Sequence, residues 1–414
     1  MLAGCGQQQQ APAASDDPNS AGVGHPGAPE VVYIGVLLPQ TADPDAAQRS
    51  RSAMEIAADI INSSHDIDWD MAKAKGIAAY GNAKLELRFA DAGSTAAEAY
   101  AAVKHFNDMG IGLVISACDS DTGAAIALAC HQFGQTLICG SATGARLTDG
   151  SYGIDNTLWR IAATSQMETD MFLEYLQQVS VLQEGTVKNV SVAYINTPES
   201  NRTLDTLETA LAEASMKEVA VISYDVGDLD MAEEATKLTT NQPDVIFKIS
   251  QAAELPHFVT SYKQTKYIPK AILCYNGQLM DQSLLMAVNK AGADFWYGSM
   301  VCPDPYYRST EAKDAAAVNA SVIYGYLNSL YRPQTNSALN NRSLLDMSSV
   351  FVMAQAVAMA GTAERSAVAA SLLNNVFPAP YLYSGSIDFD ESGQNTVCSS
   401  YIAKAVEGRY TYGY

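Results

Sequence analysis

The chain has 414 residues, more than one compact hydrophobic core usually organises, so two or three domains are expected. Its 25 Lys and Arg residues against 45 Asp and Glu residues give a formal net charge of −20, which argues against a nucleic-acid-binding protein and against a polybasic membrane surface. Hydrophobic residues make up 48% of the chain, an ordinary share for a globular protein, so most of it should fold.

The N-terminal segment carries a processing signal. The sequence LAGC at residues 2–5 matches a bacterial lipobox, in which the cysteine is lipidated, although the basic and apolar parts of a signal peptide are missing. Residues 6–30 contain almost no branched or aromatic side chain and are predicted to be a disordered linker. We therefore predict lipidation of Cys5, an extracytoplasmic location in the periplasm or at the cell surface, and contact with the membrane only through that lipid anchor.

Strand and helix patterns alternate from Val31 onward. Apolar runs rich in branched residues predict strands, and apolar side chains spaced by three and four residues predict helices. In chain order the first half is predicted to contain a strand at 31–38, a helix at 45–62, a strand at 85–89, a helix from Ser94 or Thr95 to Met109, a strand at 111–117, a helix at 123–133 and strands at 136–139 and 157–161.

The same alternation restarts after residue 164. Residues 31–39 and 190–198 begin two similar runs, as expected of two lobes with one architecture. The second half is predicted to contain helices at 167–179, 203–215, 231–239 and 252–263, strands at 189–195, 219–224, 244–249, 271–274 and 295–301, long helices at 311–331 and 343–360, and terminal strands at 381–389 and 397–406.

This order predicts an α/β fold of two doubly wound, parallel-sheet lobes joined by three crossover strands. The crossings are expected near residues 161–165, 299–304 and 380–387. A tandem of two separate Rossmann-like domains is the alternative. The predicted parts are the lipobox and linker at 1–30, lobe 1 at 31–162 plus 302–380, and lobe 2 at 163–301 plus 381–414.

Two polar loops follow neighbouring predicted strands between Ile111 and Thr148. Parallel strands would bring both loops to the carboxyl edge of one sheet, where ligands of open α/β sheets bind. The alternative is local: the two acids could cap the next helix, and the hydroxyls could satisfy a turn. The predicted ligand-binding residues of these loops are Asp119, Ser120, Asp121, Thr122, Ser141, Ala142 and Thr143.

Motifs for catalysis and metal binding are absent from the sequence. There is no G-x-S-x-G elbow, no Walker loop, no G-x-G-x-x-G after a strand and no H-E-x-x-H, and the five histidines are scattered. Two segments begin like calcium loops, at Asp119 and Asp388, but have Cys130 and Ser399 at the twelfth position. We therefore expect no catalysis, no cofactor and no metal.

Six cysteines remain if Cys5 is lipidated. None has a spacing typical of zinc sites, so they are predicted to be three disulfides or six buried thiols. Cys274 and Cys302, which end consecutive predicted strands, are the favoured pair.

Several motifs keep a common order along the chain: IGVLLP at 34–39, MEIAADIIN at 54–62, CDSDT at 118–122, SATGARLT at 141–148 followed by LWRIAAT at 158–164, and GSIDFDESGQ at 385–394. Together they resemble the type I periplasmic-binding-protein family, most of all its branched-chain (hydrophobic) amino-acid branch of ABC-transporter solute-binding proteins. The resemblance covers most of residues 31–410. It implies a two-lobed protein that closes on a small ligand and then docks on a membrane permease.

The resemblance also implies roles for site residues. In the family, the loops matching 118–122 and 141–143 bind the ligand's carboxylate through hydroxyls and backbone N–H groups, and lobe 2 would contribute from positions matching Asn201, Gln251 and Asn276. The position of Asn276 is typically acidic, because it pairs with the ligand's ammonium group, and the position of Asn201 is often aromatic. An amide cannot neutralise a buried ammonium.

Asp119 and Asp121 also place acids where a carboxylate should dock. A small polar or amine-bearing metabolite therefore fits as well as a plain α-amino acid. The predicted function is capture of such a ligand by a monomeric solute-binding protein of an ABC importer. A ligand-sensing lobe that feeds a receptor or signalling partner is the alternative.

Overall fold

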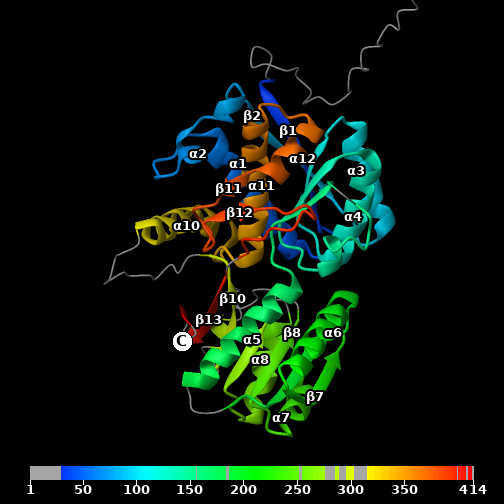
Figure 1. Cartoon of the computed structure of the whole chain (residues 1–414), viewed down its shortest axis with the longest axis vertical. Coiled ribbons are helices and arrows are strands. Elements are labelled where there is room, and N and C mark those ends of the chain that lie inside the picture. Colours follow the sequence, from blue (N-terminus) through cyan, green and yellow to red (C-terminus); the bar gives the residue numbers. More distant parts are fainter. Residues whose placement is uncertain are drawn as a thin grey trace, which may run out of the picture.

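The chain forms two α/β lobes stacked along the long axis of the molecule (Figure 1), as a computed structural model shows. One lobe is built mainly from the N-terminal elements with the late helices, and the other from the middle of the chain with the C-terminal strands. The predicted fold class is therefore confirmed. The structure describes residues 29–154, 156–182, 186–250, 254–275, 285–288, 295–302, 315–398, 400–406 and 409–412.

The first lobe is organised around a parallel five-stranded sheet. Its second strand, β1, is the run VVYIGVLL, in which residues 34–38 are buried on both faces, as expected for a strand covered by helices on both sides. The strand order is β2 (Lys84–Asp91), β1 (Val31–Leu38), β3 (Leu113–Ser116), β4 (Thr136–Cys139) and β5 (Leu158–Arg160).

Helices cover both faces of this sheet. On one face α1 packs against α11, and their apolar side chains share a core with alternate residues of β1; on the other face α3 and α4 pack on the opposite residues of the same strands. The helices of this lobe are α1 (Pro44–Asn62), α2 (Asp70–Lys73), α3 (Ala96–Asp108), α4 (Ser120–Phe133), α10 (Ala315–Thr335), α11 (Asn341–Ala360) and α12 (Arg365–Asn374), with short 3-10 turns η2 (Ala78–Tyr80) and η3 (Ala145–Leu147).

The second lobe contains a seven-stranded mixed sheet. Five neighbouring strands are parallel up to one edge of the sheet, and the last two strands of the chain, β13 and β14, extend the other edge through antiparallel pairing. The strand order is β14 (Arg409–Tyr412), β13 (Tyr401–Val406), β10 (Trp296–Met300), β9 (Ala271–Cys274), β8 (Val245–Ile249), β6 (Asn189–Ile195) and β7 (Lys217–Tyr224). The helices are α5 (Ser165–Leu182), α6 (Pro198–Glu213), α7 (Ala232–Thr239) and α8 (Leu255–Thr265).

Two connections between the lobes lie side by side and are joined by hydrogen bonds. The backbone N–H of Arg160 donates to Gly393 O at 2.7 Å, and the N–H of Asn395 donates to Arg160 O at 3.0 Å. The Asn395 side chain also donates to Ile161 O at 3.0 Å. At the end of β10, the side chain of Asn341, the first residue of α11, donates to Ser299 O at 2.9 Å. These contacts tie the first lobe to the strands that leave it.

The strand predicted at 381–389 is wrong. Residues 376–388 instead form a short antiparallel hairpin of β11 (Val376–Pro378) and β12 (Ser386–Asp388), with β11 beside α11. Residue ranges 376–378 and 386–388 are therefore paired with each other rather than with a strand of either large sheet. Helix α12 was not predicted as a separate element.

Helix α11 is apolar along most of its length. By length and composition it is the one helix among the described residues that could cross a membrane, but 78% of its most apolar window is buried inside the fold. It is thus the core helix of the first lobe, packed against α1.

The six cysteines of the described residues are all thiols, so the expected pair between Cys274 and Cys302 is wrong. Five of them are buried, and burial raises the pKa of Cys139 and of Cys274 to about 12. They act here as small apolar core residues.

Candidate functional site

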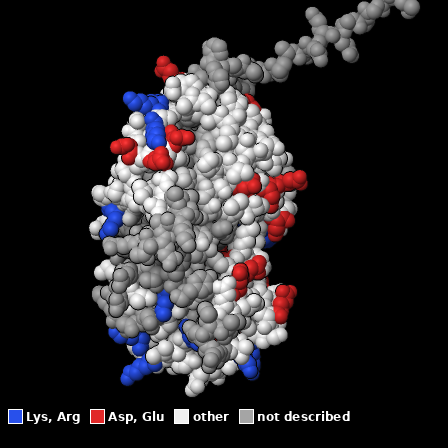
Figure 2. Space-filling model, turned by 60° about the vertical axis from the view of Figure 1, so that its left-hand side comes forward, with Lys and Arg blue, Asp and Glu red and all other residues white. Residues whose placement is uncertain are grey.

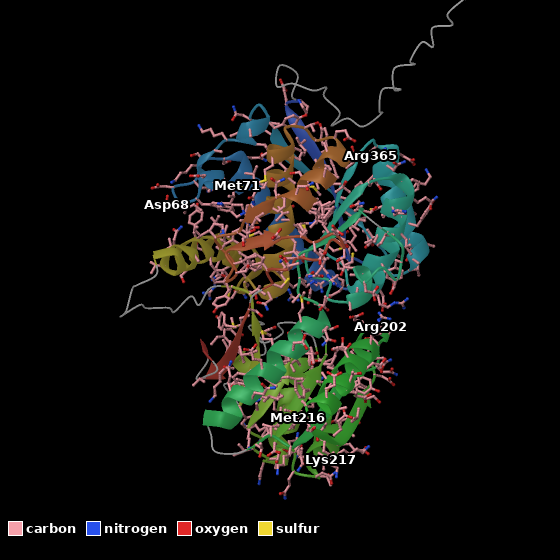
Figure 3. The ribbon with its side chains drawn as sticks, viewed as in Figure 1. Asp68, Met71, Arg202, Met216, Lys217 and Arg365 are labelled. Atoms are coloured by element: carbon pink, nitrogen blue, oxygen red, sulfur yellow. The ribbon has the colours of Figure 1, made fainter. Side chains whose placement is uncertain are left out.

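The first turns of α4 and α6 face each other across the two lobes. Each helix follows the carboxyl end of a parallel strand, β3 in one lobe and β6 in the other, and the two helices are in contact. Figure 3 shows Arg202 of α6 at the end of the second lobe that is nearest to the first lobe. The carboxyl edges of the two sheets, where the sequence predicts the ligand site, therefore face each other.

On the side of the first lobe, the predicted loop 118–122 is a helix cap and first turn. Asp119 is the N-cap of α4, and its carboxylate accepts the backbone N–H of Thr122 at 2.8 Å. Ser120 is 7% exposed, and its Oγ accepts the backbone N–H of Gly144 at 2.9 Å. This bond joins the two predicted loops to each other. The helix starts at Ser120 rather than at the predicted Gly123 because Asp119 caps it.

The loop after β4 rests on a buried carboxylate of α11. Ala142 is buried, whereas Ser141 and Thr143 are half-buried. Burial raises the pKa of Asp346, and hydrogen bonds from Ser50 and Ser141 lower it. The Ser50 hydroxyl donates to Asp346 Oδ2 at 2.6 Å. Asp346 on α11 therefore helps to position the loop after β4, a role that the sequence prediction missed.

A second buried charged residue, Arg160, is hydrogen-bonded to the same loop. Its guanidinium donates to Gly144 O, to Thr148 Oγ1 and, through Nε at 2.6 Å, to Gln394 Oε1. Burial lowers the pKa of Arg160 to about 10, so the side chain stays protonated at neutral pH. Arg160 thus connects the loop after β4 with the connection between the lobes. Only its place in the LWRIAAT motif singled it out in the sequence.

On the side of the second lobe, two charged residues that sequence analysis missed reach toward the first lobe. Arg202 Nη2 lies 2.6 Å from Asp121 Oδ1 across the lobes and 2.9 Å from Glu199 Oε2 on its own helix. A Cβ added to Gly144 would lie 2.8 Å from Glu199 Oε2, so the Glu199 carboxylate packs on the loop of the opposite lobe. Burial raises the pKa of Glu199, and Arg202 lowers it.

A helix-start signal could have found these two residues. Thr197 caps α6, accepting the backbone N–H of Ser200 at 3.2 Å, and Pro198 occupies the first helical position. Threonine followed by proline is a typical helix start, which moves the beginning of α6 from the predicted residue 203 to residue 198. Glu199 and Arg202 then lie in the first turns, three residues apart on one face.

The other predicted residues of the second lobe have no established place in the site. Asn201 lies in the first turn of α6 and donates to Asn196 Oδ1 at 3.5 Å, a local contact within the same lobe. Gln251, Asn276 and the predicted lipidation site Cys5 lie outside the described residues. Within the described ranges, no group of three His, Cys, Asp or Glu residues could hold a metal ion.

The ion pair between Arg202 and Asp121 should favour the closed arrangement of the lobes. Because both side chains are partly exposed, we expect Arg202→Met to shift the closed-to-open ratio of the ligand-free protein by about two- to fivefold toward open. The measurement is the radius of gyration by small-angle X-ray scattering at low salt. Lys237→Met, which removes an ion pair within α7, is the control. An unchanged radius of gyration for Arg202→Met would contradict the expectation. Because 0.5 M salt screens the ion pair, the unmodified protein in this salt should have a radius of gyration close to that of Arg202→Met.

The surface agrees with the strongly acidic composition. In the view of Figure 2, acidic side chains gather along one edge of both lobes, and the coloured residues of this face form no broad basic patch. A small-molecule cleft fits this surface better than a nucleic-acid-binding face.

Two α/β lobes with largely parallel sheets, hydrogen-bonded connections and facing carboxyl edges form the architecture of a two-lobed solute-binding protein. The chain belongs to the periplasmic binding protein family, whose model matches residues 31–409. This is a family of extracytoplasmic solute-binding proteins, as the resemblance predicted.

Solved structures share this fold. A leucine-binding protein, LivK, from Thermotoga maritima is 17% identical with a TM-score of 0.69, covering 92% of this chain and 98% of that protein. The branched-chain amino-acid-binding protein LivJ of Streptococcus pneumoniae, solved with isoleucine, has the same identity and TM-score, covering 92% and 97%. A Rhodopseudomonas palustris solute-binding protein solved with benzoate is 11% identical with a TM-score of 0.69, covering 92% and 95%. No curated protein matches the sequence.

Proposed function

We propose that this protein is the solute-binding component of an ABC importer and captures a small polar metabolite or an amino-acid-like ligand between its lobes. The observation that carries the proposal is the direct contact of α4 and α6 across the lobes, at the carboxyl edges of both sheets. In this proposal lobe 1 comprises residues 31–162 plus 302–380, and lobe 2 comprises residues 163–301 plus 381–414. The ligand-binding residues include Asp119, Ser120, Asp121, Thr122, Ser141, Ala142 and Thr143.

The proposed cycle is a hinge motion. The ligand first binds one open lobe, and closure about the connections near Arg160 and Gly393 then buries it and presents a new surface to the permease. The ligand drives closure only through contacts that it makes better in the closed form. The protein performs no chemistry, acts as a monomer, and is held at the membrane through lipidated Cys5.

The names of the structural neighbours support transport rather than sensing. LivJ is named as a transporter substrate-binding protein and the Rhodopseudomonas palustris protein as part of an ABC transporter, and the structures reported above were solved with, or named for, an amino acid or an aromatic acid. These ligands set the classes to test. The neighbours do not show which of these ligand classes this protein binds, because a sequence identity of 11–17% supports the fold alone.

A thermal-shift screen of the full chain tests the proposal. The panel holds amino acids, their deaminated acids, amines, aromatic acids, sugars and nucleosides. A ligand at 100 times its dissociation constant should add about 2.7 kcal/mol of stability, which raises Tm by a few degrees. A shift confined to one chemical class is the expected result. A panel in which no compound changes Tm would contradict capture of a small metabolite.

A further inference from the structure

A buried amide, Gln394, lies between the loop after β4 and two of the connections between the lobes. The side chain is 5% exposed, and both of its polar atoms are hydrogen-bonded. Its Oε1 accepts Nε of Arg160 at 2.6 Å and the Thr148 hydroxyl at 3.3 Å. Its Nε2 donates to Ala162 O at 3.1 Å and to Asn395 O at 2.8 Å. A buried polar network whose members are all satisfied is rigid and favours a single arrangement.

The same network continues to the residue of the first lobe on which the second lobe packs. The Arg160 guanidinium donates to Gly144 O, and the Gly144 N–H donates to Ser120 Oγ at 2.9 Å. A Cβ built on Gly144 would lie 2.8 Å from Glu199 Oε2 of α6. The peptide groups of Gly144 are therefore held by the first lobe at the point where α6 of the second lobe approaches.

The position of Gln394 makes this network sensitive to the angle between the lobes. Ala162 lies on the connection that follows β5, and Asn395 lies on the connection that precedes β13. Hinge motion of two lobes changes the backbone of the segments that connect them. Because one amide bonds to both connections and to Arg160, these three groups cannot move apart without breaking at least one of its hydrogen bonds.

We propose that Gln394 is a positioning residue that couples the angle between the lobes to the loop at Gly144. When the lobes open, the Gln394 bonds are strained or lost, and the loop loses the arrangement that it has in the closed form. The coupling is reciprocal, so a ligand that orders the loop favours closure by the same free energy. This inference rests on the proposed function for the ligand and adds the residue through which closure is transmitted.

Hydrogen–deuterium exchange of the ligand-free full chain tests the coupling through a double-mutant cycle. Arg202→Met removes the ion pair with Asp121 and favours open lobes. In the otherwise unmodified chain it should raise the exchange rate of residues 141–148 about two- to fivefold, in proportion to the open population. Gln394→Met, which has a similar length and no amide, should raise the exchange rate of this segment by itself. In that background Arg202→Met should add less than about 1.5-fold, because the loop then opens without motion of the lobes.

A matched control separates coupling from a general loss of stability. Thr136→Val removes a buried hydrogen bond to Arg365 O, 2.9 Å long, from the strand that precedes the loop, but it does not touch the connections. The response to Arg202→Met should persist in this background. Circular dichroism and a cooperative unfolding transition verify that each variant folds. Gln394→Asn, whose amide is too short to keep all four bonds, is a second variant that should give the same result as Gln394→Met.

Three outcomes would overturn the inference. The first is an equal response to Arg202→Met with and without Gln394, because the approach of Glu199 to Gly144 would then suffice to protect the loop. The second is no response in the otherwise unmodified chain, and the third is loss of the response in Thr136→Val. None of these measurements uses a ligand. A thermal-shift panel without any binding compound would therefore contradict the proposed function and leave the coupling as measured, and the reverse also holds.

Discussion

Gly393→Ala is expected to lower the free energy of unfolding by more than about 3 kcal/mol. Gly393 has a φ of +79°, and a Cβ built on it would lie 1.9 Å from Leu158 O. The obstacle is backbone, so no side-chain rotation can relieve it. Its own carbonyl also accepts the N–H of Arg160 at 2.7 Å, so displacement of this turn breaks a bond between the two connections of the lobes. The measurement is thermal or urea unfolding of the variant beside the unmodified chain.

Gly385→Ala is the matched control for this substitution. Gly385 has a similar φ of +72°, but a Cβ there meets nothing within 4 Å. Its cost should therefore be limited to the left-handed backbone, about 1–2 kcal/mol. Equal losses in the two variants would show that backbone conformation alone, and not the close approach of Leu158, sets the stability of the Gly393 turn.

Lys248→Met is expected to stabilise the protein by about 1–4 kcal/mol at pH 7. Lys248 is fully buried on β8, where its ammonium donates to the Tyr224 hydroxyl and lies 4.1 Å and 4.9 Å from the ring centroids of Tyr224 and Phe258. Burial lowers the pKa of Lys248 from 10.5 to about 7, and charge interactions with Cys274 and Glu254 oppose the shift. Methionine has a similar length and carries no charge, so it removes the cost of desolvation.

The pH dependence has a definite sign. Because the pKa of Lys248 is lower in the folded state than in the unfolded state, the unfolded chain binds the extra proton between about pH 7 and pH 10.5. The contribution of Lys248 to stability therefore improves as pH rises through this window and is lost as pH falls to 7. The advantage of Lys248→Met should shrink as pH rises from 7 to 10. Lys404→Met, at a half-buried lysine of the same sheet, is the control, and an advantage of Lys248→Met independent of pH would contradict the account.

Local signals in the sequence were sufficient for most elements. The buried apolar runs at β4, β6 and β9 have the predicted bounds, and Thr95 caps α3 through a capping box with Glu98, as its position suggested. These features depend on neighbours within a few residues, so periodicity and capping chemistry predict them. The strand predicted at 381–389 was too long because the buried Tyr381 and Leu382 of the hairpin's turn resemble the apolar residues of a strand.

The residues of the candidate site also fall into two groups: those that local sequence signals could place and those that they could not. Asp119, Ser120 and the hydroxyls after β4 could be placed at one sheet edge from the order of strands and loops alone. Arg160, Asp346, Glu199 and Arg202 could not, because each acts on a residue of another segment. Arg202 meets Asp121, 81 positions away in the sequence, only when the two lobes face each other.

The sequence by itself determined the α/β class, the two repeating lobes and the family, because these follow from local periodicity and from motifs whose order survives divergence. The tertiary structure alone decided which charges meet between the lobes and which backbone donors are already used. Such contacts depend on the relative position of two separately folded sheets. A one-dimensional pattern does not contain that position, because the energy that sets it comes from long-range packing and electrostatics rather than from neighbours along the chain.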